Sequence, residues 1–150
     1  MVVGVSRGTS RTGHDQPMTT LEDRHQAVLV TLRADGSPQT SNIAFTLKDG
    51  VARVSVTADR AKTRNLERDP RCLLHVLGST FWEYAALPAT ATLGPVTTEP
   101  GDEAGRELLE VYEAITGNAH PDPDEFFAAM VAERRLVLHL ALQPGTGPLA

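Results

Sequence analysis

The sequence has little cysteine and no recognisable metal-binding pattern. Cys72 is the only cysteine among the 150 residues, so an internal disulfide is impossible and a reducing cytoplasm is the expected location. Cys72 lies in the apolar run CLLHVL, where a cysteine usually acts as a small buried hydrophobe and not as a nucleophile. The five histidines show no metal-ligand spacing with one another or with Cys72. We therefore expect no metal site.

The motifs of several common enzyme classes are also missing. The chain contains no G-x-S-x-G, no P-loop, no G-x-G-x-x-G and no H-E-x-x-H. Nucleophilic and metal-dependent hydrolysis are thus without support, and no side chain stands out as a dedicated acid or base. No apolar run approaches the ~18 residues that span a membrane, and no signal peptide is visible. We expect a protein without a membrane partner.

The charge is negative overall but unevenly distributed. The formal net charge of −5 argues against general nucleic-acid binding. Residues 53–71 nevertheless hold six basic and three acidic residues, so this segment can attract an anion. Residues 99–133 hold ten acidic residues and only Arg106 on the basic side, which is typical of a solvated helical face.

Hydrophobic patterning predicts a mainly β (α+β) fold. Residues 1–20 are rich in Gly, Ser, Thr and Arg and are predicted to be a mobile tail. Residues 21–150 are predicted to form one domain, with hairpin signals at Asp35-Gly36 and at residues 48–50. Six strands joined mostly by tight turns favour an antiparallel sheet closed into a small barrel, which removes exposed edges. The expected strands are 27–33, 38–47, 51–57, 71–78, 82–96 and 134–142, and the expected helices are 60–69, 101–117 and 123–133.

The predicted helix at 60–69 begins with cations. Helix N-termini carry partial positive charge, so Arg60, Lys62 and Arg64 each cost about 0.3–1 kcal/mol there. Asp59 is the expected N-cap. Lys62 stands four residues before Leu66 and shares its inward face, so its ammonium group should lean over the edge of the barrel. An external phosphate would resolve the conflict. The alternative is a solvated basic helix neutralised by nearby acidic residues, namely Asp59, Glu67 and Asp69.

Two further features suit a planar ligand. The half-strand Gln39–Asn42 is polar, so it is able to hydrogen-bond a ring, although ordinary exposure at a strand end explains it as well. Trp82, the sole tryptophan, lies in TFWEYAAL. Its indole suits stacking on a ring or sealing an interface, and a core or dimer contact without a ligand explains it equally well.

Three segments together resemble a known family. DGSPQTSNIAF, VSVTADRAKTRNLERDPR and FWEYAAL…ATATL are similar to the flavin and deazaflavin split-barrel superfamily named after pyridoxamine 5'-phosphate oxidase. The similarity runs from about residue 24 to 140. The RAKTRNLERDPR block looks most like the actinobacterial branch that binds coenzyme F420, a deazaflavin with a phosphate and a polyglutamate tail.

The resemblance implies a homodimer of six-stranded split barrels with two cofactor sites at the subunit interface. Arg60 and Lys62 would hold the cofactor phosphate and the start of its acidic tail, and Trp82 would reach the cofactor from the partner subunit. The other cofactor contacts implied are Gln39, Asn42, Ser55, Val56 and Thr57 along the ring, and Ala61 and Thr63 near the phosphate.

The function implied is hydride transfer from a reduced deazaflavin to a small conjugated or quinone-like substrate. FMN is the alternative cofactor, which would make the protein an FMN-dependent oxidase or reductase. A non-catalytic flavin or deazaflavin carrier, and a basic surface for an acidic partner, remain open.

Overall fold

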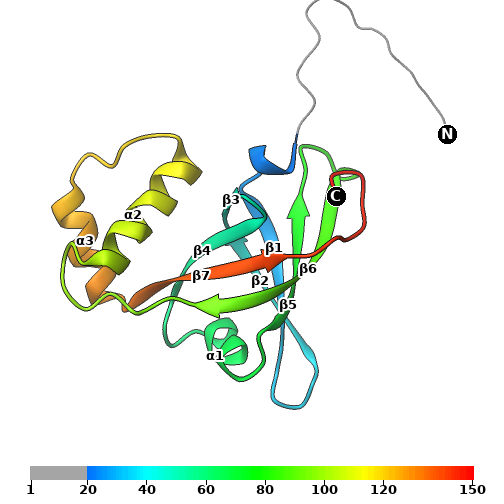
Figure 1. The fold of residues 1–150 in the computed structure, drawn as a ribbon, viewed down its shortest axis with the longest axis horizontal. Coiled ribbons are helices and arrows are strands. Elements are labelled where there is room, and N and C mark those ends of the chain that lie inside the picture. The colour runs from blue at the N-terminus through cyan, green and yellow to red at the C-terminus, as the bar shows by residue number, and fades with distance from the viewer. Residues whose placement is uncertain (1–19) are drawn as a thin grey trace, which may run out of the picture.

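The computed structural model describes residues 20–150, and it is mainly β with three α-helices (Figure 1). The predicted mobile tail lies outside these residues except for Thr20. No helix in this range combines the length and the apolar character needed to cross a bilayer. The strands are β1 Gln26–Leu32, β2 Pro38–Ala44, β3 Thr46–Lys48, β4 Val51–Thr57, β5 Arg71–Leu77, β6 Tyr84–Leu93 and β7 Arg135–Leu142; the helices are α1 Ala61–Arg68, α2 Glu103–Thr116 and α3 Pro123–Ala132.

The strands form one antiparallel sheet in the order β2-β1-β5-β6-β7-β4-β3. The two edge strands, β2 and β3, are consecutive in the chain and are separated only by Phe45. One residue cannot bridge the two edges of a flat seven-stranded sheet, so the sheet must curl on itself. Figure 1 shows the resulting half-barrel.

The strand count of six was wrong because the predicted strand 38–47 divides at Phe45. The part before Phe45 pairs with β1 and the part after it pairs with β4. Phe45 itself is fully buried, and its N–H donates to the carbonyl of His25 (3.0 Å). The turn between the two strands is therefore part of the core, and the sequence pattern alone does not distinguish it from a continuous strand.

The core lies inside the curl and follows the predicted alternation. Along β4, Ala52, Val54 and Val56 point inward and are at most 2% exposed. Leu29 of β1 and Leu74 of β5 meet them and are completely buried. Burying a side chain of this size contributes about 1.5–3 kcal/mol, so these positions account for much of the drive to fold.

Helix α1 covers one end of the half-barrel, at the bottom of Figure 1. Leu66 is buried in the main core, and Thr63 Oγ1 donates to the carbonyl of Thr57 (2.7 Å). The helix ends at Arg68, just before Asp69-Pro70, as proline requires. The expected N-cap was wrong: Arg60, and not Asp59, occupies the N-cap position, and it makes no side-chain capping bond.

Helices α2 and α3 form a hairpin beside β4 and β7 (Figure 1). Leu108, Val111 and Phe126 pack with Val137 into a second small core. Asp102 caps α2 by accepting from the N–H of Gly105 (2.8 Å), and backbone N–H groups hold the pKa of this carboxyl well below its ordinary range. The two predicted helices are confirmed.

Candidate functional site

Three cations meet at the N-terminus of α1. Lys62 is half-buried, and this burial together with Arg60 and Arg135 lowers the pKa of Lys62 below its ordinary value of 10.5. No acidic residue among residues 20–150 forms an ion pair with Arg60 or Lys62. The cluster therefore has an unbalanced positive charge, on a chain whose net charge is −5.

The acidic residues that were expected to neutralise this helix do not do so. Asp69 pairs with Arg71 instead (2.8 Å), and hydrogen bonds from Arg71 lower the pKa of Asp69 to about 2. In the described part of the chain, neither Asp59 nor Glu67 makes a salt bridge. The simple explanation of a self-neutralised basic helix is thus poorly supported.

The backbone adds further donors. The first helical bond of α1 runs from the N–H of Arg64 to the carbonyl of Arg60 (3.1 Å). The preceding N–H groups of Ala61, Lys62 and Thr63 therefore have no partner within the helix. Because the N-cap side chain makes no capping bond, these donors remain available to an anion.

An open cleft of about 560 Å³ adjoins the cluster. One wall is the β4–α1 loop and the other is the turn between α3 and β7; the lining residues are Thr57, Asp59, Arg60, Ala132, Glu133, Arg134 and Arg135. Thr57 Oγ1 is the one buried side-chain polar atom of residues 20–150 without a hydrogen-bond partner. A buried hydroxyl without a partner is costly, and this one belongs to a residue that also lines the cleft.

Arg135 was missed by the sequence analysis. Its Nη1 donates to Ser55 Oγ (3.2 Å) and its Nε pairs with Glu133 (2.7 Å). Arg135 lies opposite Thr57 in the β4–β7 ladder. Knowing that ladder would have pointed to Arg135, but the sequence does not show which strands pair.

Seven of the predicted cofactor contacts gather at this end of the sheet. They differ in what they offer a ligand. Val56 is only 2% exposed and faces the core, so it has only main-chain groups to offer. The hydroxyl of Thr63 already bonds Thr57, which leaves its backbone N–H. The seven are Ser55, Val56, Thr57, Arg60, Ala61, Lys62 and Thr63.

Gln39 has a structural role that the sequence did not reveal. Its Oε1 accepts from Thr31 Oγ1 (3.0 Å), which in turn accepts from Asn65 Nδ2 of α1 (3.0 Å). Thr31 is completely buried and Asn65 is 7% exposed. This chain of hydrogen bonds ties α1 to β1 and β2 and so holds the N-terminus of α1 in place.

Asn42 and Trp82 lie away from the cationic cluster. Asn42 is on the outer face of β2, where it lines a hollow of about 340 Å³ with Gln26 and Leu77. Trp82 is in the β5–β6 turn, is 76% exposed, and contacts Phe81 edge-to-face at 4.7 Å. β5 starts just after α1 and runs away from it for seven residues, so this turn is about 20 Å from α1. Within one chain, the predicted ring contacts do not converge.

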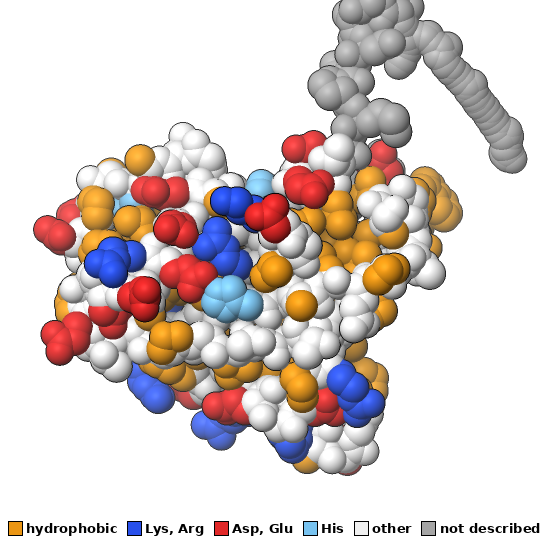
Figure 2. All heavy atoms as spheres, in the orientation of Figure 1, with side chains coloured by type: hydrophobic (Ala, Val, Ile, Leu, Met, Phe, Trp, Pro, Cys, Tyr) orange, Lys and Arg blue, Asp and Glu red, His pale blue; other side chains and the backbone are white. Residues whose placement is uncertain are grey.

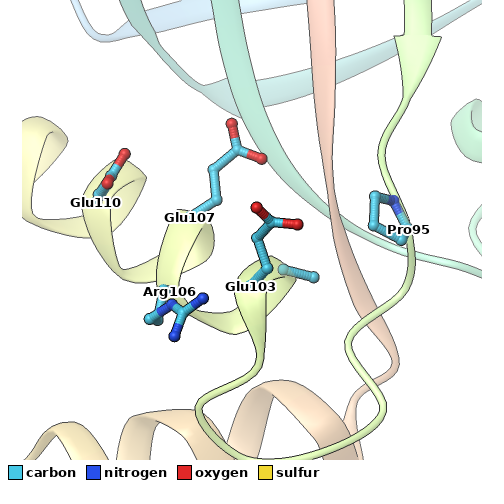
Figure 3. Close-up of a pocket in the computed structure, with 6 residues that line it drawn as sticks. Pro95, Glu103, Arg106, Glu107 and Glu110 are labelled. Atoms are coloured by element: carbon cyan, nitrogen blue, oxygen red, sulfur yellow. The ribbon is translucent and has the colours of Figure 1, made fainter.

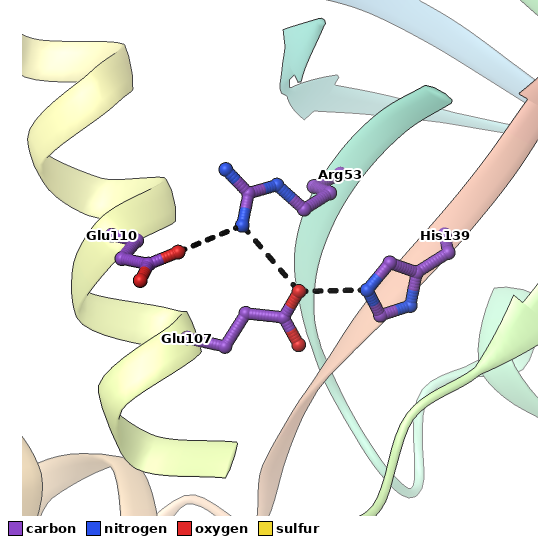
Figure 4. Close-up of polar contacts among 4 residues, drawn as sticks. All are labelled: Arg53, Glu107, Glu110 and His139. Atoms are coloured by element: carbon purple, nitrogen blue, oxygen red, sulfur yellow. Dashed lines mark hydrogen bonds and ion pairs between the residues drawn. The ribbon is translucent and has the colours of Figure 1, made fainter. Parts of the chain in front are cut away.

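In Figure 2 acidic side chains gather over α2 and α3 with basic side chains among them, and further basic and acidic side chains lie along the lower edge. Beside α2 is a hollow of about 440 Å³ lined by Pro95, Glu103, Arg106, Glu107 and Glu110 (Figure 3). Figure 4 shows the polar contacts next to it. Arg53 Nη1 bonds Glu110 (3.1 Å) and Glu107 (3.4 Å), and Glu107 also bonds His139 Nε2 (2.7 Å).

These contacts join α2 to the outer face of β4 and β7. Each group is partly exposed, and such pairs contribute about 0–1 kcal/mol. His139 thus has a structural role, bonded to Glu107. No cluster of residues 20–150 has the donors that would hold a metal ion. Burial raises the pKa of Cys72 to about 11, so its thiol stays protonated near neutral pH and is a poor nucleophile.

The chain is similar in sequence to known proteins. The sequence model of a family described as "Pyridoxamine 5'-phosphate oxidase" matches residues 14–143. Over 70 residues the chain is 36% identical to an F420H(2)-dependent biliverdin reductase of Mycobacterium tuberculosis (strain CDC 1551 / Oshkosh). That match covers 45% of this chain and 51% of the relative, so it spans about half the length of this curated protein.

The fold is shared with solved structures of other proteins, two of which illustrate the similarity. An F420 reductase superposes with a TM-score of 0.65 at 21% identity, covering 87% of this chain and 98% of its own. A putative pyridoxamine 5'-phosphate oxidase from Listeria innocua superposes with a TM-score of 0.59 at 13% identity, covering 87% and 93%. At these identities the likeness establishes a shared fold and leaves the chemistry to be argued from the site.

Proposed function

The chain belongs to the pyridoxamine 5'-phosphate oxidase family, and from this premise we propose that it is a coenzyme F420-dependent oxidoreductase. It transfers hydride from the reduced deazaflavin to a small conjugated or quinone-like substrate. The match to an F420H(2)-dependent biliverdin reductase supports the choice of cofactor. The observation that carries the proposal is the cationic N-terminus of α1, which holds Arg60 and Lys62 without an acidic partner in residues 20–150.

This site fits a phosphate ester. A half-buried ammonium group, an exposed guanidinium and uncapped helix N–H groups are what binding of a phosphate requires. Thr57, whose buried hydroxyl lacks a hydrogen-bond partner, lines the adjoining cleft. When bound, the cofactor supplies the hydride chemistry.

The residues of the chain bind and orient the cofactor. Lys62 and Arg60 take the phosphate, and the N–H groups of Ala61 and Thr63 fix its position. Arg135 holds Ser55 through a hydrogen bond (3.2 Å), so the strand segment Ser55–Thr57 presents a fixed polar edge to the ring system. Buried Leu66 and the bond from Thr63 to Thr57 keep the helix rigid, so little ordering is needed on binding.

A second copy of the chain would complete the site. In one chain Asn42 faces outward from β2 and Trp82 lies in the β5–β6 turn, away from Lys62, so we expect them to act on the cofactor of a partner subunit. The outer face of β1 and β5 offers an apolar surface for such a partner, with Leu77 38% exposed. Half-buried Val28, Val30, Leu32 and Leu73 extend that surface. We therefore propose that the protein is a homodimer in which Trp82 of each subunit closes the cofactor site of the other.

FMN is the second candidate, because the family match and the phosphate site suit it equally well. A non-catalytic cofactor carrier also fits the same residues. Both readings keep Arg60 and Lys62 as anchors. They differ from the main proposal in which cofactor binds more tightly and in whether a bound reduced cofactor is turned over.

A fluorescence titration of the purified protein with oxidised coenzyme F420, run beside FMN, tests the proposal. Trp82 is the sole tryptophan and reports stacking directly. Tight saturable quenching by the deazaflavin with weak FMN binding supports it. Tighter binding of FMN would make the protein an FMN-dependent member of the family. If F420 binds tightly but a panel of quinones and tetrapyrroles does not oxidise the reduced cofactor, the protein is a non-catalytic carrier. Binding of neither cofactor refutes the site.

A further inference from the structure

The segment that follows β7 continues along β6 and covers the part that β7 leaves unpaired. β7 pairs with the second half of β6, as far back as Ala89. Residues 143–149, named the strap, lie along the first half. Ala86 of β6 and Thr146 of the strap exchange two backbone hydrogen bonds (2.8 and 3.1 Å). Figure 1 shows the strap in red after the end of β7.

Two glycines allow the strap to approach β6 this closely. A Cβ atom on Gly145 would overlap the carbonyl oxygen of Ala86. A Cβ atom on Gly147 would lie 2.5 Å from the carbonyl oxygen of Tyr84, and the φ of Gly147 is +108°, a conformation that side chains disfavour. The close contact therefore depends on these two positions having no side chain.

The strap reaches the point where the chain leaves the β5–β6 turn. The N–H of Leu149 donates to the carbonyl of Tyr84 (3.0 Å), and the Leu149 side chain packs against the main core. Tyr84 is the first residue of β6 and stands two residues after Trp82. Its ring stacks on His75 of β5 (5.3 Å). The backbone next to Trp82 is thus held by β5 on one side and by the strap on the other.

Trp82 has little packing of its own. Its side chain is 76% exposed. The turn is closed by a bond from the N–H of Gly78 to the carbonyl of Glu83 (2.8 Å), and on the β5 side Arg24 Nε donates to the carbonyl of Leu77 (3.0 Å). The place of the indole ring is therefore set by the backbone on either side of the turn.

We infer that the strap is a positioning element for Trp82, acting through Tyr84, and that Gly145 and Gly147 seat it. In the proposed homodimer Trp82 closes the cofactor site of the partner subunit, so the strap sets how well that site closes. This consequence rests on the proposed function. A displaced strap would leave the turn free to move on the nanosecond-to-microsecond timescale of loops, whereas the phosphate contacts at the N-terminus of α1 would stay intact.

The test compares Gly147→Ala with Gly117→Ala. Gly117 is the matched control, because it ends α2 with a φ of +74° and a Cβ there meets nothing within 4 Å. Trp82 is the sole tryptophan, so fluorescence anisotropy of the free protein reports its mobility. Gly147→Ala should lower this anisotropy, reduce the maximal quenching by oxidised coenzyme F420, and weaken binding roughly 2- to 10-fold through loss of one aromatic contact. Gly117→Ala should change none of the three.

Unchanged anisotropy in Gly147→Ala, or an equal change in Gly117→Ala, would overturn the inference. Lower anisotropy with full quenching would overturn it too, because the strap would then order the turn without affecting the site. If the wild type does not bind F420, the proposed function fails and the anisotropy of the two variants alone decides the role of the strap. If Gly147→Ala does not fold, Leu149→Ala takes its place, since it loosens the strap while keeping its backbone donor and both glycines.

Discussion

Arg135 Nη1 lies 3.2 Å from Ser55 Oγ, on the strand next to it. This contact links a residue near the end of the chain to the predicted cofactor-binding segment. It also places the guanidinium of Arg135 close enough to Lys62 to lower the pKa of its ammonium group. The last strand therefore contributes both a support and a charge to a site that the sequence placed on one short helix.

Replacing Lys62 should weaken cofactor binding without lowering the stability of the free protein. Lys62→Met should weaken cofactor binding about 10- to 100-fold, because a charge-assisted hydrogen bond of about 1.5–3 kcal/mol is lost. The same change should leave the unfolding temperature of the free protein equal or higher, since it removes a cation crowded by Arg60 and Arg135. Titration and thermal unfolding check both halves. Lys48→Met, the other lysine, is the control and should alter neither; a large loss of stability in Lys62→Met would contradict the prediction.

Stability of the free protein should rise with pH in the alkaline range. Since the pKa of Lys62 is lowered in the folded state, the unfolded chain binds more protons between that lowered pKa and 10.5. Holding Lys62 charged in the folded protein destabilises it. This destabilisation is fully present below the folded-state pKa of Lys62 and disappears as pH rises through this window. Chemical unfolding measured across the window should show a positive slope attributable to Lys62. A slope that persists unchanged in Lys62→Met would assign it to another group.

Cofactor affinity should change with pH in the opposite direction. A bound phosphate needs Lys62 protonated, so affinity falls as pH rises through the lowered pKa of the free protein. Lys62→Arg keeps its charge in this range and should remove the pH dependence. Titrations at neutral and alkaline pH check this. Identical profiles for the two proteins would show that Lys62 does not contact the anion.

The buried hydrogen bond between Asn65 and Thr31 should matter for stability. Asn65→Ala leaves the hydroxyl of fully buried Thr31 with fewer partners and should cost about 1–3 kcal/mol. The double variant Asn65→Leu with Thr31→Val should lose less free energy of unfolding than the sum of the losses in Asn65→Leu alone and Thr31→Val alone. The reason is that the double variant leaves fewer unsatisfied polar groups. Urea unfolding of the set checks this. Strict additivity would mean that the two side chains act independently.

Mixing two defective variants tests the shared site. If Lys62 of one subunit and Trp82 of the other act on one cofactor, Lys62→Ala and Trp82→Ala proteins should each bind poorly. Refolding them together should restore binding, since a mixed dimer has one site with both residues intact. The measurement is the number of tight sites per chain after mixing. No recovery, with mixed dimers confirmed by mass, would place both residues at a site within one chain or remove Trp82 from it.

Much of the local structure could be predicted because it depends on neighbouring residues. Alternation of apolar side chains along β4 marks a strand with one buried face, and Asp69-Pro70 ends α1 where proline must. The cations before Leu66 stood out because they conflict with the helix dipole, which is also a local effect. These features depend on residues close together in the sequence and not on which segments meet in the fold.

Long-range features required the tertiary structure. The division of the predicted strand at Phe45, the pairing of β4 with β7 that brings Arg135 to Ser55, and the bond from Gln39 through Thr31 to Asn65 all join residues far apart in sequence. The separation of Trp82 from Lys62 within one chain also depends on the tertiary structure. By itself the sequence determined which segments become strands or helices and where cations collect. Only the folded chain decided which of those segments meet, because strand pairing and the curl of the sheet depend on the packing of the whole core.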